Sequence, residues 1–369
     1  MRSILKRRGV LFSLLLVLAL VAAACSSSDD STDTTEATGG TEATTTTAAA
    51  LPGEGVKVGM AFDIGGRGDQ SFNDSAAIGL EKAITDYGID TTELEADAGG
   101  ENREENLRLL AEDGSELIIA VGFAFAEGVT NVATDFPDTF FGIIDDASID
   151  LPNVAGLVFA EHEGSALVGA AAALKSQTGT IGFIGGVSGF GLIEKFQAGY
   201  EFGARQVNPD IEILVTYLSA APDFAGFNDP AKATESAQGM FDEGADVIYH
   251  AAGGSGAGLF EAAKSYSEAN GTKVWGIGVD SDQYNTVAPE VQEYVLTSMI
   301  KRVDVSVYTT VTNLIEGNRQ SGVLVFDLAA DGVGYSTSGG FVDDITGELD
   351  ALREQIITGE LEVPTEPAG

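Results

Sequence analysis

The segment VKVGMAFDIGGRGDQSFNDSAAIGLEKAI, residues 56–84, carries the pattern that decides the fold. Its first seven residues form a mostly apolar run that ends at Asp63, which is typical of a buried strand. A glycine-rich turn follows, and the residues from Ser75 to Tyr87 then have a helical amphipathic pattern. The segment therefore predicts a strand, a turn and a helix, with Phe72 in the turn at the carboxyl end of the strand.

The same alternation continues along the chain. Further strands are predicted at ELIIAVGF, TFFGIID, NVAGLVF, GTIGFIG, IEILVTYL, DVIYHA, KVWGIGVD, EYVLTSMI and VLVFDL. Helices are predicted at 164–175, 192–207, 230–243, 258–269 and 302–316. Strands that are apolar on both faces and alternate with helices predict parallel sheets with helices on both sides.

About ten strands fit two sheets better than one, so the predicted fold class is α/β, with two doubly wound parallel-sheet lobes joined by a hinge. Plausible crossing points between the lobes are 161–164 and 280–283. The N-terminal lobe would comprise residues 55–160 and 281–320, and the C-terminal lobe residues 161–280 and 321–369.

The charge balance excludes several classes of partner. The chain has 19 Lys plus Arg against 57 Asp plus Glu, a formal net charge of -38. A general basic surface for nucleic acid or for anionic lipid is therefore not expected, and phosphorylated ligands are disfavoured.

The N-terminus has the pattern of a bacterial lipoprotein signal peptide, residues 1–24. Basic residues precede an apolar run from Gly9 to Ala24, which is short for a membrane span. Cys25, the only cysteine, follows small residues at the cleavage site, so we expect it to carry the lipid. Ordinary secretion with cleavage near the alanines is the alternative. Residues 25–54, rich in Ser, Thr and acids, are expected to form a disordered tether to the extracytoplasmic face of the cell membrane.

The residues that follow the predicted strands form a consistent set, because ligands of doubly wound folds lie at the carboxyl ends of strands. The set comprises the turn 63–73, Asp145 and Asp146 after TFFGII, the glycine-rich turn 253–258, Asp280 and Lys301. All of these side chains would face one crevice if two lobes close over it.

At this point the chain resembles a known family over nearly all of its predicted folded body. The phrases GDQSFN, GFIGG, KFQAGYEFGARQVNPD, FNDPAKA, GADVIYHAAGGSGAG, WGIGVDSDQ and SMIKRVD, in this order, are similar to the basic membrane protein family of purine nucleoside-binding lipoproteins. The resemblance implies a type I periplasmic-binding-protein fold and a substrate-binding protein of an ABC importer, with no cofactor and no metal. Its partners would be guanosine, adenosine or inosine and the ABC permease subunits, and the protein is expected to be a monomer.

The resemblance also implies roles for individual residues. Phe72 and Phe227 would stack on the two faces of the base, with Phe224 as an alternative to Phe227. Asp280 would accept hydrogen bonds from the ribose hydroxyls beside Lys301, which would donate to a hydroxyl or the ring oxygen. The remaining ligand-binding candidates are Asp63 and one of Asp145 and Asp146 at the base edge, Asn73 at the base edge or sugar, and Gly253 and Gly254, whose backbone amides could approach the ligand closely.

Structural explanations of these residues remain open. Any Asp after a strand can cap the next helix, Phe72 can pack against that helix as a hydrophobic staple, and Gly256 and Gly258 can belong to a tight turn. A nucleoside-cleaving enzyme and a receptor for another small solute, such as a sugar, are the alternative functions. Signals for catalysis are weak, because His162 and His250 are the only histidines and neither has metal-ligand spacing.

Overall fold

A computed structural model of the chain describes residues 50–368. The predicted signal peptide, Cys25 and the tether up to residue 49 lie outside the described residues. The end of the predicted tether, residues 50–54, is already part of the ordered body, because the Gly53 N–H donates to the carbonyl of Tyr87 at 2.8 Å. None of the helices within residues 50–368 is long and apolar enough to cross a membrane.

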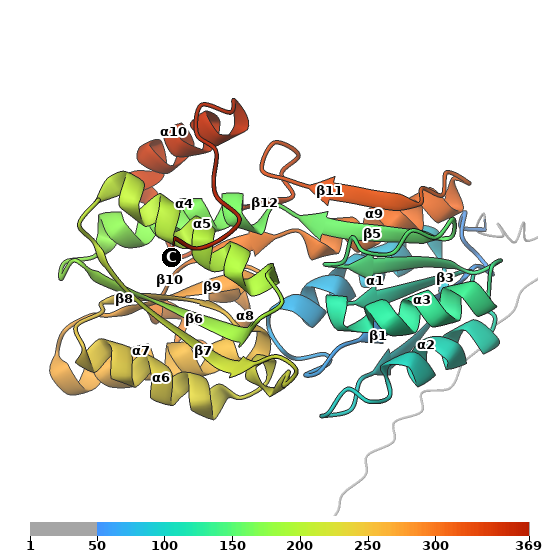
Figure 1. Cartoon of the computed structure of the whole chain (residues 1–369), viewed down its shortest axis with the longest axis horizontal. Coiled ribbons are helices and arrows are strands. Elements are labelled where there is room, and N and C mark those ends of the chain that lie inside the picture. Colours follow the sequence, from blue (N-terminus) through green and yellow to red (C-terminus); the bar gives the residue numbers. More distant parts are fainter. Residues whose placement is uncertain (1–49, 369) are drawn as a thin grey trace, which may run out of the picture. The chain divides into compact units, whose positions relative to one another are not determined.

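Two six-stranded sheets form the core of this body (Figure 1). The first sheet has the order β11-β5-β4-β3-β1-β2 and the second the order β12-β10-β9-β8-β6-β7. The strands are β1 (Lys57–Phe62), β2 (Asp90–Glu95), β3 (Leu117–Val121), β4 (Phe140–Ile144), β5 (Val154–Phe159), β6 (Thr180–Ser188), β7 (Glu212–Ala220), β8 (Val247–Ala251), β9 (Trp275–Asp280), β10 (Val295–Lys301), β11 (Gly322–Phe326) and β12 (Val333–Tyr335). Every pairing is parallel except that of β12 with β10. The α/β prediction of two parallel-sheet lobes is confirmed.

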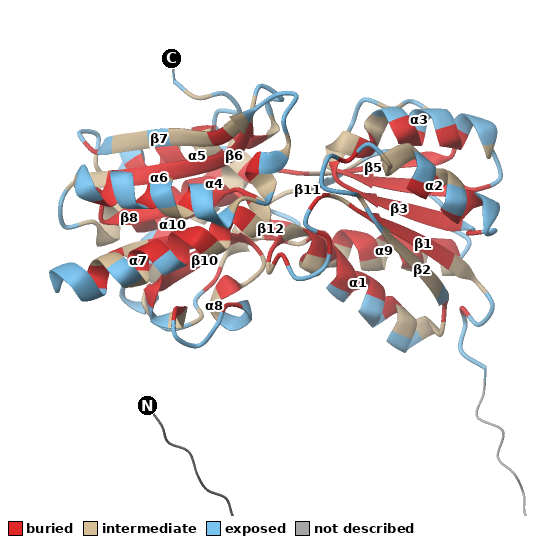
Figure 2. Cartoon of the chain, turned by 90° about the horizontal axis from the view of Figure 1, so that it is seen from below, coloured by how far each residue is buried: buried red, intermediate tan, exposed pale blue. Residues whose placement is uncertain are grey.

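Helices pack on both faces of the sheets, and their buried faces turn toward the strands (Figure 2). They are α1 (Phe72–Tyr87), α2 (Arg103–Glu112), α3 (Ala126–Asp135), α4 (Glu161–Lys175), α5 (Leu192–Val207), α6 (Pro230–Asp242), α7 (Ala257–Asn270), α8 (Gln283–Thr286), α9 (Val303–Ile315) and α10 (Thr346–Ile357). In β1, Met60 packs in the cluster that contains Leu80 of α1, whereas Ala61 packs in the cluster that contains Leu107 of α2. Successive strand residues point to opposite faces, so both faces of β1 must be apolar.

Two strands were not predicted from the sequence, and each departs from the apolar-run pattern. Strand β2, with the sequence DTTELE, lies at a sheet edge and is only partly buried, so it needs few apolar residues. Strand β12 has three residues and pairs antiparallel with β10. Both lie at sheet edges, where hydrophobic patterning is weakest.

The sheet topology differs from the predicted lobe boundaries. Strand β10 pairs with β9 in the second sheet, and β11 pairs with β5 in the first. The chain therefore does not change lobes at residues 280–283, where β9, α8 and β10 form one continuous crossover within the second sheet. It changes lobes between β5 and α4, between β10 and α9, and between β11 and β12.

Backbone hydrogen bonds hold these three crossing segments side by side. The Ala160 N–H donates to the Phe326 carbonyl at 3.1 Å, and the Arg302 N–H donates to the Gly332 carbonyl at 2.9 Å. The crossings are thus gathered at one side of the body, where short segments can absorb a rotation of one lobe against the other.

Candidate functional site

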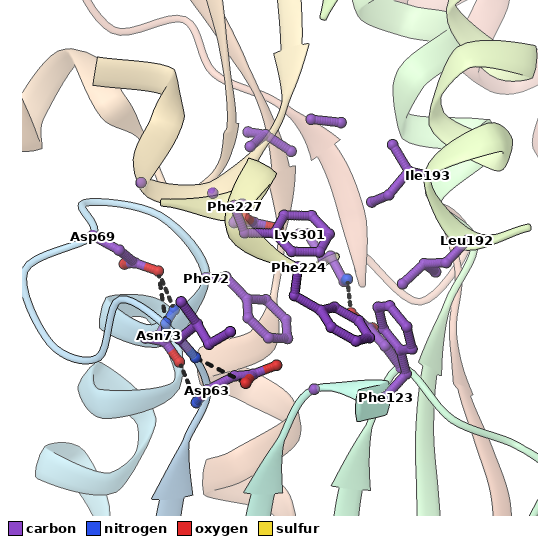
Figure 3. A pocket seen from close by; sticks show the side chains of 18 of the residues that line it. Asp63, Asp69, Phe72, Asn73, Phe123, Leu192, Ile193, Phe224, Phe227 and Lys301 are labelled. Atoms are coloured by element: carbon purple, nitrogen blue, oxygen red, sulfur yellow. Dashed lines mark hydrogen bonds and ion pairs between the residues drawn. The ribbon is translucent and has the colours of Figure 1, made fainter. Parts of the chain in front are cut away.

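A cavity of about 680 Å³, its open mouth included, lies between the carboxyl ends of the strands of the two sheets (Figure 3). Nine predicted binding residues line it: Asp63, Phe72, Asn73, Asp145, Phe227, Gly253, Gly254, Asp280 and Lys301. Asp146 does not. Other lining residues are Asp69, Phe123 and Phe224. The residues that were chosen because they follow predicted strands therefore lie together at one cavity, with the exception of Asp146.

Phe72 and Phe227 enter the cavity from different lobes. Phe72 is the first residue of α1, and Phe227 ends the short 3-10 turn Ala225–Phe227. The Phe227 ring has room because Gly186 lies beside it, where a side chain would collide with the ring. Gly122 lies beside Phe72 and has φ of 123°, a conformation that favours glycine. In Figure 3 both rings point into the space between the lobes. Two such rings can hold a flat apolar group by stacking.

Asp69 caps helix α1 and so determines where Phe72 lies. Its carboxylate accepts the backbone N–H groups of Ser71, Asn73 and Asp74 at 2.9, 2.8 and 3.1 Å. Burial raises the pKa of Asp69 to about 6, although these hydrogen bonds oppose the shift. Ser71 occupies the N-cap position but makes no capping bond with its hydroxyl. Asp69 was missed from the sequence; the signal was an Asp at capping distance from the helix start.

Lys301, at the end of β10, is the buried cation of the site, with a side chain only 1% exposed. Its Nζ donates to Asp145 Oδ2 at 2.6 Å and lies 3.5 Å from Glu161 Oε1. Burial lowers the pKa of Lys301, but the carboxylates of Asp145, Glu161 and Asp280 outweigh burial and raise it above its usual value. Lys301 therefore stays charged. Its Nζ also lies 5.0 Å from the centre of the Phe72 ring.

Asp145 and Asp280 flank Lys301 at the ends of β4 and β9. Both have left-handed backbones, with φ of 68° and 63°. Burial raises the pKa of Asp145 to about 6, with Lys301 opposing and Glu161 adding to the shift. Burial likewise raises the pKa of Asp280, against Lys301 and the Ser71 hydroxyl. Asp145 Oδ1 is buried and has no hydrogen-bond partner among residues 50–368. A buried acceptor of this kind can receive a hydrogen bond from a ligand.

Asp63 and Asn73 form the opposite wall. Arg103 Nε donates to Asp63 Oδ1 at 2.7 Å, and Asn73 Oδ1 accepts the Asp63 N–H at 3.2 Å. Asn73 Nδ2 donates to Asp69 at 3.1 Å, so both ends of this amide already have protein partners. Burial raises the pKa of Asp63, and Arg103 opposes the rise. Nothing in the sequence marked Arg103, because it lies on α2 and not at a strand end.

Of the remaining predicted residues, some line the cavity and others serve only the local structure. Gly253 and Gly254 lie in the turn after β8, and a side chain on Gly253 would approach the Phe227 carbonyl to 3.2 Å. Gly256 packs against the His250 ring and therefore fits the structural explanation. Asp146 accepts the Ser148 N–H and hydroxyl, both at 2.9 Å, and caps a local turn away from the cavity.

Aromatic rings of the two lobes meet at the cavity, which Phe123 and Phe224 line, while Phe190 stacks on Phe224 outside the lining. Phe123, which follows β3 in the first lobe, lies 5.1 Å from Phe190 and 5.9 Å from Phe224 of the second lobe. The Arg103 guanidinium lies 5.0 Å over the Phe224 ring. Phe123 could have been found from the sequence, because it is the last residue of the predicted strand segment ELIIAVGF and residues at strand ends were the candidates.

The described residues include no group of three or more His, Cys, Asp or Glu side chains that could hold a metal ion. The polar chemistry that they do place at the cavity is that of carboxylate acceptors, one ammonium group and backbone amides.

Comparisons with known proteins agree with this architecture. Residues 56–366 match the family model described as ABC transporter substrate-binding protein PnrA-like. The chain is 32% identical over 326 residues to the ABC transporter nucleoside-binding protein BmpA of Lactococcus lactis, covering 84% of this chain and 89% of that protein. It is also 32% identical over 291 residues to an uncharacterized lipoprotein of Pyrococcus horikoshii, covering 77% of this chain and 69% of the relative.

A solved structure of an ABC transporter system solute-binding protein from Aeropyrum pernix superimposes with a TM-score of 0.73 at 28% identity, covering 85% of this chain and 94% of the other. The family, the Lactococcus lactis protein and the Aeropyrum pernix protein are described as binding proteins of ABC transporters and not as enzymes. Because the family model spans the whole described body from β1 onward, the chain belongs to the family of PnrA-like ABC transporter substrate-binding proteins.

Proposed function

We propose that the protein binds purine nucleosides, namely guanosine, adenosine or inosine, in the cavity and delivers them to an ABC permease. The observation that carries the proposal is the pair of Phe72 and Phe227 rings from opposite lobes beside buried carboxylates. A nucleoside combines a flat base with a sugar rich in hydroxyl donors, which suits both features. The nucleoside-binding relative from Lactococcus lactis supports the same class of ligand.

Each group of lining residues can be assigned to the base or to the sugar of the proposed ligand. Stacking of a base on an aromatic ring contributes about 1–3 kcal/mol per ring. Asp280 is proposed to accept hydrogen bonds from the ribose hydroxyls, with Lys301 donating to the sugar, while Asp63 and Asp145 accept from the base edge. The second Nδ2 hydrogen of Asn73 and the backbone amides of Gly253 and Gly254 complete the proposed contacts.

The charges at the cavity favour a nucleoside over a nucleotide. Asp63, Asp69, Asp145 and Asp280 line it, whereas Lys301 is the only Lys or Arg among the lining residues and is already paired with Asp145. Arg103 is already paired with Asp63 and Lys301 with Asp145, so neither cation is free for a phosphate group, and the other two carboxylates repel it. Nucleoside monophosphates are therefore expected to bind much more weakly than the corresponding nucleosides.

Mass spectrometry of the protein purified from its native membrane under native conditions tests the proposal. We expect a co-purified nucleoside, and a denatured mass that exceeds the polypeptide from Cys25 by that of attached lipid. In a thermal-shift panel, a nucleoside at about 100 times its Kd should stabilise the protein by about 2.7 kcal/mol. No shift with any nucleoside would contradict the ligand, a shift with sugars alone would favour a sugar receptor, and released free base would indicate an enzyme.

Nucleoside affinity should fall below pH 6 because of Asp145. Its pKa is raised to about 6, so it is ionised at pH 7.5 and mostly protonated at pH 5. A ligand N–H or O–H must then displace the proton, which weakens binding by about tenfold at pH 5. Titration calorimetry at both values would measure this. Lys301, Glu161, Asp280 and Lys195 also act on this carboxyl group, so Asp145→Asn is the control.

In Asp145→Asn, binding should be weaker at pH 7.5 and change little between pH 5 and 7.5. If the affinity of this variant still falls between pH 7.5 and pH 5, another group, such as Asp69, causes the pH dependence. Equal wild-type affinity at both pH values would contradict the role of Asp145.

A further inference from the structure

The turn Gln70–Ser71 of the first lobe is bonded to the second lobe at the segment 280–286. Ser71 Oγ donates to Asp280 Oδ2 at 2.6 Å, and Ser281 Oγ donates back to the Ser71 carbonyl at 2.9 Å. The Gln70 carbonyl accepts from Gln283 Nε2 at 3.1 Å and from Thr286 Oγ1 at 3.3 Å. These four hydrogen bonds, with a further one of 3.2 Å from Ser71 Oγ to the Val279 carbonyl, link the lobes through two consecutive residues.

The Gln283 amide has one possible orientation. Its Oε1 accepts the Val279 N–H at 3.0 Å and lies 2.8 Å from His250 Nε2. Burial lowers the pKa of His250 to about 4, against the hydrogen bond to Gln283, so the imidazole is neutral at physiological pH. Because Oε1 accepts, His250 Nε2 carries the proton. The Gln283 Nε2 group is therefore directed at the Gln70 carbonyl.

The turn itself needs this support. Gln70 has φ of 57°, in the left-handed region that favours glycine. Asp69 binds the backbone N–H groups on the helix side of the turn, while the Gln70 carbonyl and the Ser71 hydroxyl bond to the other lobe. The Ser71 carbonyl accepts both from Ser281 Oγ and from the Ser75 N–H of α1. Phe72 follows Ser71 directly, so the position of the turn also sets the position of the proposed stacking ring relative to Asp280.

We propose that Gln283 is a positioning residue for ligand capture: held by His250 and the Val279 N–H, it secures the Gln70–Ser71 turn only when the lobes are closed. Loss of this bond favours opening and speeds ligand release. The bond ties the backbone beside Phe72 to the segment that begins with Asp280, so closure and formation of the ligand site occur together. The inference rests on the proposed function for its ligand measurement, but not for the measurement of lobe opening.

Gln283→Glu tests the proposal, because glutamate has the same shape and can still accept from Val279 and His250. When ionised, it cannot donate to the Gln70 carbonyl. One of its carboxylate oxygens then faces the Gln70 carbonyl oxygen, and the two repel each other. The matched control is Asn285→Ala in the same helix α8, since Asn285 bonds only to Asp282 and Ser338 of its own lobe. Stopped-flow fluorescence with guanosine, adenosine and inosine would measure the rates.

We expect nucleoside dissociation from Gln283→Glu to be about tenfold faster, because one interlobe hydrogen bond is lost and a repulsion between oxygen atoms takes its place. The association rate should stay within about threefold of wild type. Asn285→Ala should stay within about twofold of wild type. Without ligand, small-angle scattering should give a larger radius of gyration for Gln283→Glu than for either other protein. If Gln283→Glu fails to fold, Ser281→Ala removes a single interlobe bond and should speed dissociation by about threefold.

A lower melting temperature of Gln283→Glu with unchanged dissociation and unchanged scattering would overturn the proposal, because the contact would then persist in both lobe arrangements. An equal effect of Asn285→Ala would overturn it as well. If the wild type binds no nucleoside, the proposed ligand is wrong, and the scattering comparison still decides whether Gln283 controls opening.

Discussion

Phe72→Ala is expected to weaken nucleoside binding by at least about tenfold, as measured by titration calorimetry, because it removes one of the two proposed stacking faces. The melting temperature of the ligand-free protein should change little, since the ring lies at a cavity and the capping of α1 comes from Asp69. Adding Phe227→Ala should lower the affinity by a further factor of about ten. The two losses come from different lobes, so neither ring can replace the other.

Phe341→Ala is the matched control. Phe341 packs against Trp275 at 4.9 Å and does not line the cavity. This variant should lose stability and keep its affinity. The opposite result for Phe72→Ala, a loss of stability with unchanged affinity, would mean that Phe72 serves as a hydrophobic staple of α1 and that the proposed site is wrong.

Lys301→Met is expected to abolish measurable nucleoside binding and to destabilise the protein by about 3–5 kcal/mol, because it leaves the buried carboxylates of Asp145 and Asp280 without their counter-charge, whereas Glu161 keeps Lys195. Asp145, Glu161 and Asp280 surround the ammonium group, and Asp145 and Glu161 each have a side chain no more than 4% exposed. Differential scanning calorimetry should show a melting temperature lower by about 5 °C or more.

The double variant Lys301→Met with Asp145→Asn separates charge from shape. Removing one uncompensated carboxylate should recover part of the lost melting temperature while binding stays absent. If the double variant is no more stable than Lys301→Met alone, the cost comes from packing around the methionine and the charge explanation is wrong. Chemical denaturation of the four proteins of this cycle would give the coupling free energy between the two residues.

The sequence predicted most of the cavity because strand ends are visible in it. Asp63, Asp280 and Lys301 each follow or end an apolar run, and parallel strands direct such residues to one edge. The edge strand β2 was not predicted, because a partly buried strand needs no apolar run. The lobe boundaries were misplaced because β10 and β11 look alike in sequence, and only their pairing assigns them to different sheets.

Partners of the site residues could not be read from the sequence. Arg103 and Glu161 lie at the starts of helices and reach Asp63 and Lys301 only through the packing of those helices. The choice between Asp145 and Asp146 also depended on the backbone. The left-handed conformation of Asp145 accompanies its contact with Lys301, while Asp146 closes a local turn with Ser148.

The common strand order of the two sheets makes the two lobes pseudo-symmetric. The order β2-β1-β3-β4-β5 of the first sheet is repeated as β7-β6-β8-β9-β10 in the second. Asp145 and Asp280 end corresponding strands with nearly the same φ, whereas Lys301 corresponds to Phe159. The two lobes thus repeat one strand pattern and bring carboxylates to equivalent strand ends. The pseudo-symmetry is broken at Lys301 and Phe159, so one lobe offers an ammonium group where the other offers an aromatic ring.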